Sequence, residues 1–263
     1  MKGRGAVRCP AARLAAVMLA LVLLGGCAML QERPGERRFD SGRTRERYQV
    51  LRGANTGLLS LKGVGQVALR SPGRMSVSER MAFTAQPPDH MRISVRSMTG
   101  FPLLSVAANG EWVTLIEHRE GRFLRKPFDS NAFADWTGLA IHPGHLVDLL
   151  CGRLPDIDFD QAISVPDGGL LLERQWTGAR YRIRLSEDPT PALTVLERFG
   201  RDEELKWRCE LQGYRWVDGY YLPSDVRFEN DDGTVMVLRM NRQEVDEPLD
   251  PMMFLLEKPR SAS

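Results

Sequence analysis

Cysteine and histidine are scarce in this chain, with four of each among 263 residues. No two cysteines stand at CxxC spacing, and the sequence has no HExxH, P-loop or GxSxG motif. These absences exclude the usual zinc sites, P-loop nucleotide binding and serine hydrolysis at a nucleophile elbow. The carboxylates are scattered through expected turns and the solvent-facing sides of strands, so no acid–base pair can be named. We therefore expect no catalytic residue, no metal, no cofactor and no enzymatic activity.

Long hydrophobic runs are also rare, and the clearest one, from Leu14 to Leu24, is too short to span a bilayer comfortably. Four basic residues precede it and Leu24-Gly25-Gly26-Cys27 ends it, an order typical of a signal peptide. These last four residues resemble the lipobox of bacterial lipoproteins, whose cysteine receives a diacylglycerol and becomes the first residue. We predict a lipoprotein signal peptide at residues 1–26 and lipidation of Cys27; an ordinary secretory signal with an incidental cysteine is the alternative.

The lipobox resemblance also implies a location. Several acyl chains on Cys27 hold a protein on a membrane, whereas a single chain binds reversibly. By the same resemblance, Ala28 in place of an aspartate after the cysteine implies the outer membrane. We expect the rest of the chain to be a domain that faces the periplasm on a lipid anchor.

No charge of one sign dominates the chain. Its formal net charge is +2, and removal of the four basic residues of the signal changes this to −2. Neutralising phosphates requires a concentrated basic surface, so we expect no nucleic-acid partner. The remaining 237 residues, 263 less 26, suffice for one large domain.

Cys151 and Cys209 are the two cysteines that neither leave with the signal nor carry the predicted lipid. An oxidising compartment permits a disulfide between them. Two cysteines in a large domain are as often separate buried thiols, so the sequence leaves both alternatives open.

Composition and the spacing of apolar residues divide the chain from Cys27 onward into segments. Residues 27–42 are charged, contain proline and glycine, and predict a lipidated tether. Residues 43–59 have the apolar spacing of an amphipathic helix that packs on a sheet. Two short helices are expected in the middle, one through residues 131–136 and one that begins at Pro143 and runs through Leu150. Residues 257–263 form a tail.

Most of residues 43–256 is predicted to form strands. Met91, Ile93 and Val95 alternate with polar residues, and the same period of two recurs in later segments. Asn109-Gly110, Glu120-Gly121 and Asp231-Asp232-Gly233 are typical hairpin turns. About eleven strands joined by hairpins predict a mainly β fold, a curled antiparallel sheet that forms an open, unclosed β-barrel with an N-terminal helix and short helices as a plug or lid. If those helices fill the concave side loosely, an apolar cavity remains.

Three groups of residues have part of the spacing of a known binding site. Gly63-Val64-Gly65 begins a dinucleotide-binding pattern, but no strand precedes it and no helix follows; we interpret the glycines as sites of close backbone approach or a bulge. Asp156, Asp158, Asp160 and Asp167 have the spacing of calcium ligands but lack the turn glycine and the final glutamate, which favours a solvated acidic loop. His142, His145 and Asp148 lack a fourth zinc ligand, which favours surface or capping histidines.

The order of these features resembles the LolA/LolB superfamily. The resemblance rests on the lipobox, the charged linker, the helix, Ser60-Leu61-Lys62-Gly63-Val64-Gly65, Asp89 to Ile93, Gly100-Phe101-Pro102-Leu103, Asn109-Gly110 and the insert that ends Leu149-Leu150-Cys151-Gly152-Arg153-Leu154-Pro155. It implies an open β-barrel whose apolar concave face, covered by helices, holds the acyl chains of lipoproteins. The lipobox favours the lipid-anchored acceptor, LolB, which takes lipoproteins from the soluble carrier, LolA. The chain departs from the LolB pattern in its extra length and its more highly charged strands.

The resemblance implies two groups of site residues. A protruding LolB loop with an apolar tip matches Ser97-Met98-Thr99-Gly100-Phe101, so Met98 and Phe101 are candidates for membrane insertion or for simple packing at a hairpin end. Exchange of acyl chains needs reversible burial against soft side chains, and each candidate for the lining is equally a candidate for plain core. The candidates are Met91, Ile93, Trp112, Leu115, Trp207, Leu211, Met236 and Leu238.

The function expected on these grounds is binding of lipoprotein or lipid acyl chains and participation in lipoprotein localisation at the outer membrane, with a soluble lipoprotein carrier as a further partner. The alternative is a structural or scaffold lipoprotein that acts through protein contacts in an envelope assembly or export machine. The scaffold would have a fully packed concave face, and a solvent-exposed apolar patch without a cavity would favour it.

Overall fold

A computed structural model describes residues 37–73, 77–129, 132–134, 140–187 and 190–258. Cys27, the predicted signal and most of the helix expected at residues 131–136 lie outside these ranges. Residues from Arg38 onward form one compact unit. This unit begins before the boundary predicted at residue 43, because Arg38 and Phe39 pair with a strand far along the chain.

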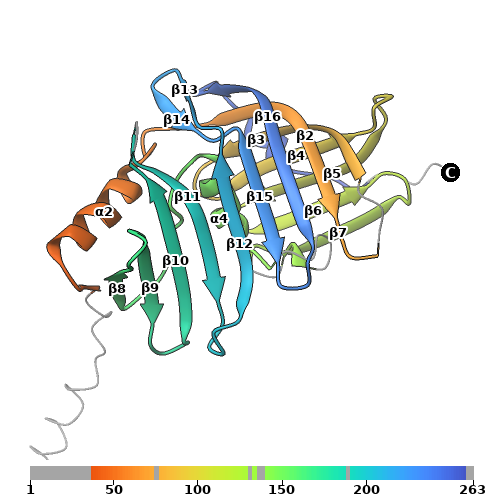
Figure 1. Cartoon of the computed structure of the whole chain (residues 1–263). Coiled ribbons are helices and arrows are strands. Elements are labelled where there is room, and N and C mark those ends of the chain that lie inside the picture. The colour runs from red at the N-terminus through yellow and green to blue at the C-terminus, as the bar shows by residue number, and fades with distance from the viewer. Residues whose placement is uncertain (1–36, 74–76, 130–131, 135–139, 188–189, 259–263) are drawn as a thin grey trace, which may run out of the picture. The chain divides into compact units, whose positions relative to one another are not determined.

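One large sheet makes up most of this unit (Figure 1). Within the described residues it has fourteen strands in the order β1-β8-β9-β10-β11-β12-β15-β16-β2-β3-β4-β5-β6-β7. All neighbours pair antiparallel except β1 and β8, which pair parallel. The strands are β1 (Arg38–Phe39), β2 (Leu61–Arg70), β3 (Val77–Gln86), β4 (His90–Arg96), β5 (Pro102–Asn109), β6 (Trp112–Glu117), β7 (Arg122–Pro127), β8 (Gln161–Ser164), β9 (Leu170–Arg174), β10 (Ala179–Ser186), β11 (Ala192–Phe199), β12 (Leu205–Gln212), β15 (Asp225–Asn230) and β16 (Val235–Val245).

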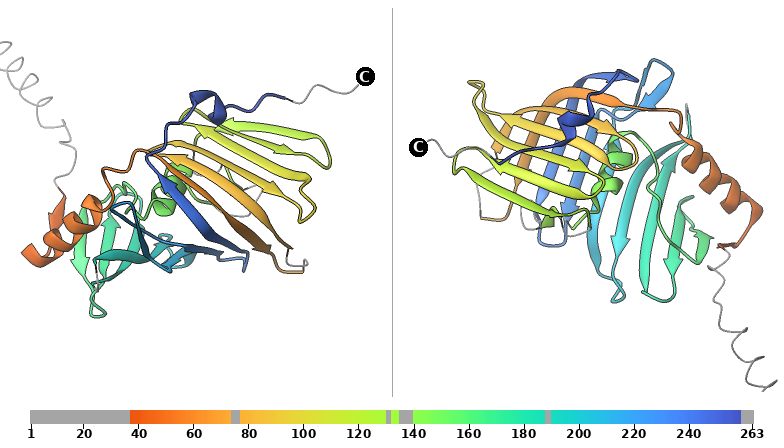
Figure 2. Two further views of the ribbon diagram at one scale, coloured as in Figure 1. Left: turned by 90° about the horizontal axis from the view of Figure 1, so that it is seen from above. Right: turned by 180° about the vertical axis from the view of Figure 1, so that it is seen from behind.

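The sheet curls but does not close, because its end strands β1 and β7 are not paired with each other. The views in Figure 2 show the half from β2 to β7 turned towards the half from β8 to β12, with a helix between them. The predicted mainly β fold with a curled open sheet is thus confirmed. The number of strands exceeds the predicted eleven, because β1 has only two residues and β8 and β9 lack a clear alternation in the sequence.

Helix α2 (Gly42–Gly53) lies beside the β8–β10 end of the sheet (Figure 1). Ser41 caps its first turn by accepting a hydrogen bond from the Thr44 backbone N–H at 3.2 Å. Tyr48 and Leu51 are buried, as predicted for a helix that packs on a sheet. The helix ends before the predicted residue 59, because Asn55 has a left-handed backbone (φ 51°). The side-chain amide of Asn55 forms hydrogen bonds with the backbone of Cys151 and Tyr221.

Helix α4 (Pro143–Leu150) lies inside the curl and matches the second predicted middle helix. His142 caps it and Pro143 occupies its first position, where the missing N–H costs nothing. Its residues Leu146, Val147, Leu149 and Leu150 are buried in the core that the sheet surrounds. The helix is therefore a plug on the concave side. No helix in the described residues is long and apolar enough to cross a membrane.

Two smaller elements complete the unit. Strands β13 (Arg215–Val217) and β14 (Tyr220–Leu222) form a separate hairpin. The 3-10 helix η2 (Pro251–Phe254) contacts β4 and β5, and buries Phe254 against His90. Turns at Gly110, Gly121 and Gly233, all with positive φ, join paired strands as the sequence predicted.

Candidate functional site

The concave face is the surface on which most predicted lining residues meet. Cross-strand pairing places Leu211 opposite Val226 and Val226 opposite Leu238, while Ile93 lies between Phe83 and Val106. Residues that pair in this way share one face of a sheet. Five of the predicted lining side chains are buried, with exposed fractions between 0% and 5%, and two more are partly buried against the same core: Met91, Leu115, Trp207, Leu211 and Leu238, then Ile93 and Met236.

Trp112 was wrongly predicted to line this face. It is three residues before Leu115 on β6, and an odd spacing in a strand places the two side chains on opposite faces. Leu115 faces the core with its partner Leu124, whereas Trp112 lies under the Arg125 guanidinium, 4.5 Å from the ring centroid to Arg125 Cζ. Trp112 therefore belongs to the convex face.

The concave face is filled by the protein's own side chains. Helix α4 and the segment that follows it contribute Leu149, Leu150, Leu154, Ile157 and Phe159 to the core, and each is at most 2% exposed. An acyl chain would need the volume that these side chains occupy. A ligand on this face therefore requires α4 to shift or to share its contacts.

A row of polar and aromatic side chains crosses one part of the concave face, and of its three members only Trp207 was predicted to lie there. Arg198 on β11 stands opposite Tyr181 on β10 and Trp207 on β12. The Tyr181 and Trp207 rings meet edge to face, with centroids 6.3 Å apart. The signal in the sequence was the even spacing of Arg198 from Leu196, an inward-facing residue that is fully buried.

His145 on α4 faces this row. Its pKa is lowered to about 4, mainly by burial and to a smaller extent by the charges of His142 and Arg198, while a hydrogen bond with the Asp156 backbone and the charge of Asp156 oppose the shift. His142, whose ring lies 5.4 Å from that of His145, has its pKa lowered mainly by burial. Both imidazoles are therefore neutral at pH 7, so the pair adds no positive charge to this face.

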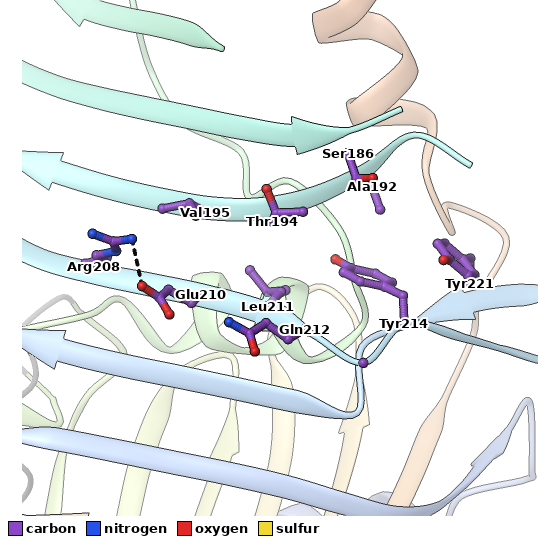
Figure 3. A pocket seen from close by; sticks show the side chains of 11 residues that line it. Ser186, Ala192, Thr194, Val195, Arg208, Glu210, Leu211, Gln212, Tyr214 and Tyr221 are labelled. Carbon is purple, nitrogen blue, oxygen red and sulfur yellow. Dashed lines mark ion pairs between the residues drawn. The ribbon is translucent and has the colours of Figure 1, made fainter. Parts of the chain in front are cut away.

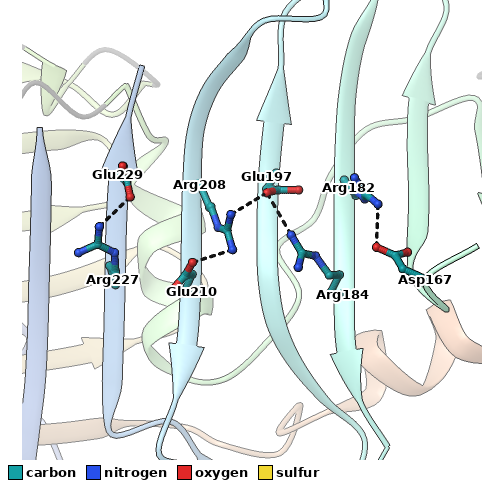
Figure 4. A network of polar contacts seen from close by, with 8 residues as sticks. All are labelled: Asp167, Arg182, Arg184, Glu197, Arg208, Glu210, Arg227 and Glu229. Carbon is teal, nitrogen blue, oxygen red and sulfur yellow. Dashed lines mark hydrogen bonds and ion pairs between the residues drawn. The ribbon is translucent and has the colours of Figure 1, made fainter. Parts of the chain in front are cut away.

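The convex face carries charged side chains in ion pairs (Figure 4). Glu197 is almost buried and forms ion pairs with Arg184 and Arg208, each at 3.4 Å, and Arg208 also pairs with Glu210 at 2.7 Å. Arg182 pairs with Asp167 at 2.7 Å. Figure 4 shows these side chains on the side of the sheet away from α4. The outward arginines thus explain the high charge of the strands.

A surface pocket of about 360 Å³ lies near the ends of β10, β11 and β12 (Figure 3). Tyr214 and Tyr221 stack at one side with ring centroids 5.0 Å apart, and the Tyr214 hydroxyl donates to the Leu193 carbonyl at 2.6 Å. Thr194 and Glu210 line the other side. The pocket is open and mixed in polarity, so it is a poor site for an acyl chain.

The loop between β4 and β5 contains the predicted membrane-insertion residues. Met98 and Phe101 are 62% and 71% exposed. The turn is held by hydrogen bonds from the Phe101 and Gly100 backbone N–H groups to Ser97. Both apolar side chains therefore project from an ordered hairpin tip, and neither is packed away at the hairpin end.

The remaining candidates have structural roles. Asp158 pairs with Arg174 and Asp167 with Arg182, while Asp160 accepts from the Gln175 backbone, so these carboxylates do not converge. No group of three or more metal ligands occurs in the described residues. Cys151 and Cys209 are separate buried thiols, and burial raises the pKa of Cys151 to about 12.

Comparison with solved structures shows which known proteins share this fold. A LolA superfamily protein of Nitrosomonas europaea matches with a TM-score of 0.52 and 10% identity, over 80% of this chain and 96% of the other. A DUF1329 family protein of Desulfovibrio piger matches with a TM-score of 0.56 and 11% identity, over 81% and 94%. The chain therefore has a LolA-like fold, as the sequence resemblance predicted. No family model and no curated protein sequence matches it.

Proposed function

We propose that this protein is a lipid-anchored envelope protein that binds acyl chains of lipids or lipoproteins on its concave face and takes part in lipoprotein localisation at the outer membrane. The observation that carries the proposal is the concave face itself. It is apolar over many strands, it is closed by a short apolar helix, and it occurs in a LolA-like fold.

The composition of this face suits reversible binding. Met81, Met91 and Met240 contribute flexible thioether side chains to the core, and Met236 is only partly buried beside them. Methionine adapts to irregular apolar ligands at low cost. Helix α4 has eight residues, and its side chains bury only against the core, so a ligand chain can replace its contacts with similar ones.

The chemistry of the proposal is exchange without a covalent step. Met98 and Phe101, exposed on one hairpin tip, would contact the membrane, and the lipid on Cys27 would keep the domain at its surface. A soluble lipoprotein carrier would supply the cargo. The LolB-like acceptor role is part of this proposal and rests on the lipobox together with the apolar tip.

Native mass spectrometry tests the proposal. Residues 28–263, which include the whole compact unit and omit the lipidated cysteine, are measured as purified, after delipidation and with added diacylated or triacylated lipopeptide. We expect one acyl ligand per chain. A folded domain that stays empty under all three conditions contradicts the proposal.

A scaffold lipoprotein is the second candidate, and one observation favours it. The concave face is already packed, with buried side chains of α4 where a ligand would lie. In that case function lies in protein contacts of the outer surface. An empty domain in the mass spectra, together with specific cross-links to envelope proteins, would support this candidate.

A further inference from the structure

Arg198 differs from the other arginines of its part of the sheet. Its neighbours Arg182, Arg184 and Arg208 face outward, and each forms an ion pair with a carboxylate. Arg198 faces the concave side, where the pairing register puts it between Tyr181 and Trp207. Arg198 is partly buried, and no carboxylate within the described ranges pairs with it. Its Nε is buried without an acceptor, as are those of Arg182, Arg184 and Arg208, so the missing carboxylate and the inward direction are what distinguish it. A positive charge on an otherwise apolar face is costly unless a partner compensates it.

Trp207 beside it lacks a partner as well. The indole is 2% exposed, and its Nε1–H has no acceptor in the part of the chain that the structure describes. A buried tryptophan N–H ordinarily finds one. Side chains directly opposite on neighbouring strands have Cβ atoms about 5 Å apart, so the Arg198 and Trp207 donors belong to one small region. Both unsatisfied groups are donors, which indicates that the missing partner is an acceptor.

The surroundings favour an anion as this acceptor. His145 on α4 interacts electrostatically with Arg198, and its imidazole, neutral at pH 7, does not balance the charge of the guanidinium. Asp156, the carboxylate that interacts electrostatically with His145, lies 3.4 Å from the Arg52 guanidinium, in an ion pair with it. The charge of Arg198 is therefore not neutralised locally. The next pair along the same face, Leu196 and Cys209, is apolar and fully buried.

We propose that Arg198 and Trp207 bind the anionic head group, a carboxylate or a phosphate, of an amphiphile whose acyl chain lies on the concave face. This inference rests on the proposed function and names its substrate class. One anionic oxygen accepts from the partly buried Arg198 guanidinium and another from the buried Trp207 indole N–H, which gives the indole the acceptor it lacks. Charge-assisted bonds of this kind are stronger than neutral ones. The head group thereby fixes which end of the ligand enters.

Matched ligands test this inference. Delipidated residues 28–263 are titrated by calorimetry with palmitate, with monopalmitoyl lysophosphatidic acid and with neutral monopalmitoylglycerol. Two hydrogen bonds to charged groups predict that the wild-type chain binds at least one anionic ligand about tenfold or more tightly than the neutral one. Preference for palmitate identifies a carboxylate, and preference for the lysophospholipid identifies a phosphate.

Three variants and one control test whether Arg198 and Trp207 cause the preference for an anionic ligand. Arg198→Gln is expected to lose the preference for the anionic ligand and to keep its affinity for monopalmitoylglycerol, whereas Arg198→Lys keeps part of the preference. Trp207→Phe is expected to reduce it. Arg182→Gln removes an outward arginine on the strand next to Arg198 and is the control that keeps the preference in full. Near-ultraviolet circular dichroism verifies that each variant is folded.

The outcomes separate the two proposals. Equal affinity of the wild-type chain for anionic and neutral ligands overturns the head-group site and leaves acyl binding in place. An unchanged preference in folded Arg198→Gln and Arg198→Lys also overturns it. Failure of all three ligands and of lipopeptide to bind overturns the proposed function as well.

Discussion

Gly65 on β2 lies where two backbones approach closely. A Cβ at this position would stand 1.8 Å from the Arg239 carbonyl oxygen on β16, at the point where the pairing register shifts between Met240 and Arg242. Of the two interpretations of the Gly63-Val64-Gly65 run, this confirms the close backbone approach, at Gly65, whereas the bulge lies on β16 and not in the glycine strand. Backbone cannot move aside as a flexible side chain can, so added volume here must distort the sheet.

Gly65→Ala is therefore expected to lower the free energy of unfolding by about 1–3 kcal/mol, the usual cost of overpacking. Chemical denaturation at equilibrium measures the change. Gly53→Ala is the matched control, because a Cβ there meets nothing within 4 Å and the residue is helical, where alanine is favoured over glycine. Equal stability of the two variants would show that β2 and β16 are further apart than described.

His145 and Asp148 on α4 have pKa shifts of opposite consequence. Burial lowers the pKa of His145 from 6.5 to about 4, so between these values the unfolded chain holds a proton that the folded chain lacks, and acidification destabilises. Burial raises the pKa of Asp148 from 3.8 to about 6, so the folded chain holds the extra proton and rising pH destabilises. Between pH 4 and 6 the two effects oppose each other.

Single substitutions should expose each effect. In Asp148→Asn the histidine remains, and stability is expected to fall more steeply than in the wild type as pH decreases from 6.5 to 4. In His145→Gln the aspartate remains, and stability should fall relative to the wild type as pH rises from 4 to 6. Each effect is on the order of 2–3 kcal/mol over its window. His142 is unchanged in both variants. Urea denaturation at several pH values measures the slopes, and parallel curves for all three proteins would contradict the assignment.

At the scale of elements, α4 occupies the space that an acyl chain would need. Leu149 is fully buried in this helix, and Leu149→Ala is expected to cost about 2–5 kcal/mol of stability through the cavity it leaves. The same cavity should strengthen acyl binding, because less protein volume must be displaced. Titration with monopalmitoylglycerol measures this gain.

Leu51→Ala is the matched control for α4. Leu51 is 1% exposed on α2, at the β8 end of the sheet, so the substitution should cost similar stability without a gain in binding. If both variants bind acyl ligand as the wild type does, α4 is not the element that a ligand displaces, and the scaffold candidate is favoured.

Local signals in the sequence were sufficient for elements with strong periodicity or turn residues. Helix α4, the hairpin turns and the inward face of β4 were predicted, because Pro143, Asn109-Gly110 and the alternation of Met91 and Ile93 act over a few residues. Strand β1 was missed because two residues carry no period, and its partner is far away in the sequence.

The site was predicted less completely than the fold. Trp112 was assigned to the concave face because it is apolar. The alternation of β6 places its side chain on the other face of the sheet from Leu115. Arg198 was missed because an arginine in a charged strand resembles its outward neighbours, and only the register with Tyr181 and Trp207 reveals its direction. Whether the concave face is open or filled depends on the packing of α4, which the sequence pattern does not specify.

At the scale of the whole molecule, the account depends on which face takes up an acyl chain. Photoaffinity labelling addresses this directly, with a palmitoyl lipid that carries a diazirine in its chain, residues 28–263 and mapping of labelled peptides by mass spectrometry. We predict labels on inward side chains such as Met91, Ile93 and Met236 and on α4, with competition by unlabelled lipid. Labels confined to the hairpin tip with Met98 and Phe101, or to the surface pocket at Tyr214 and Tyr221, would contradict acyl binding on the concave face.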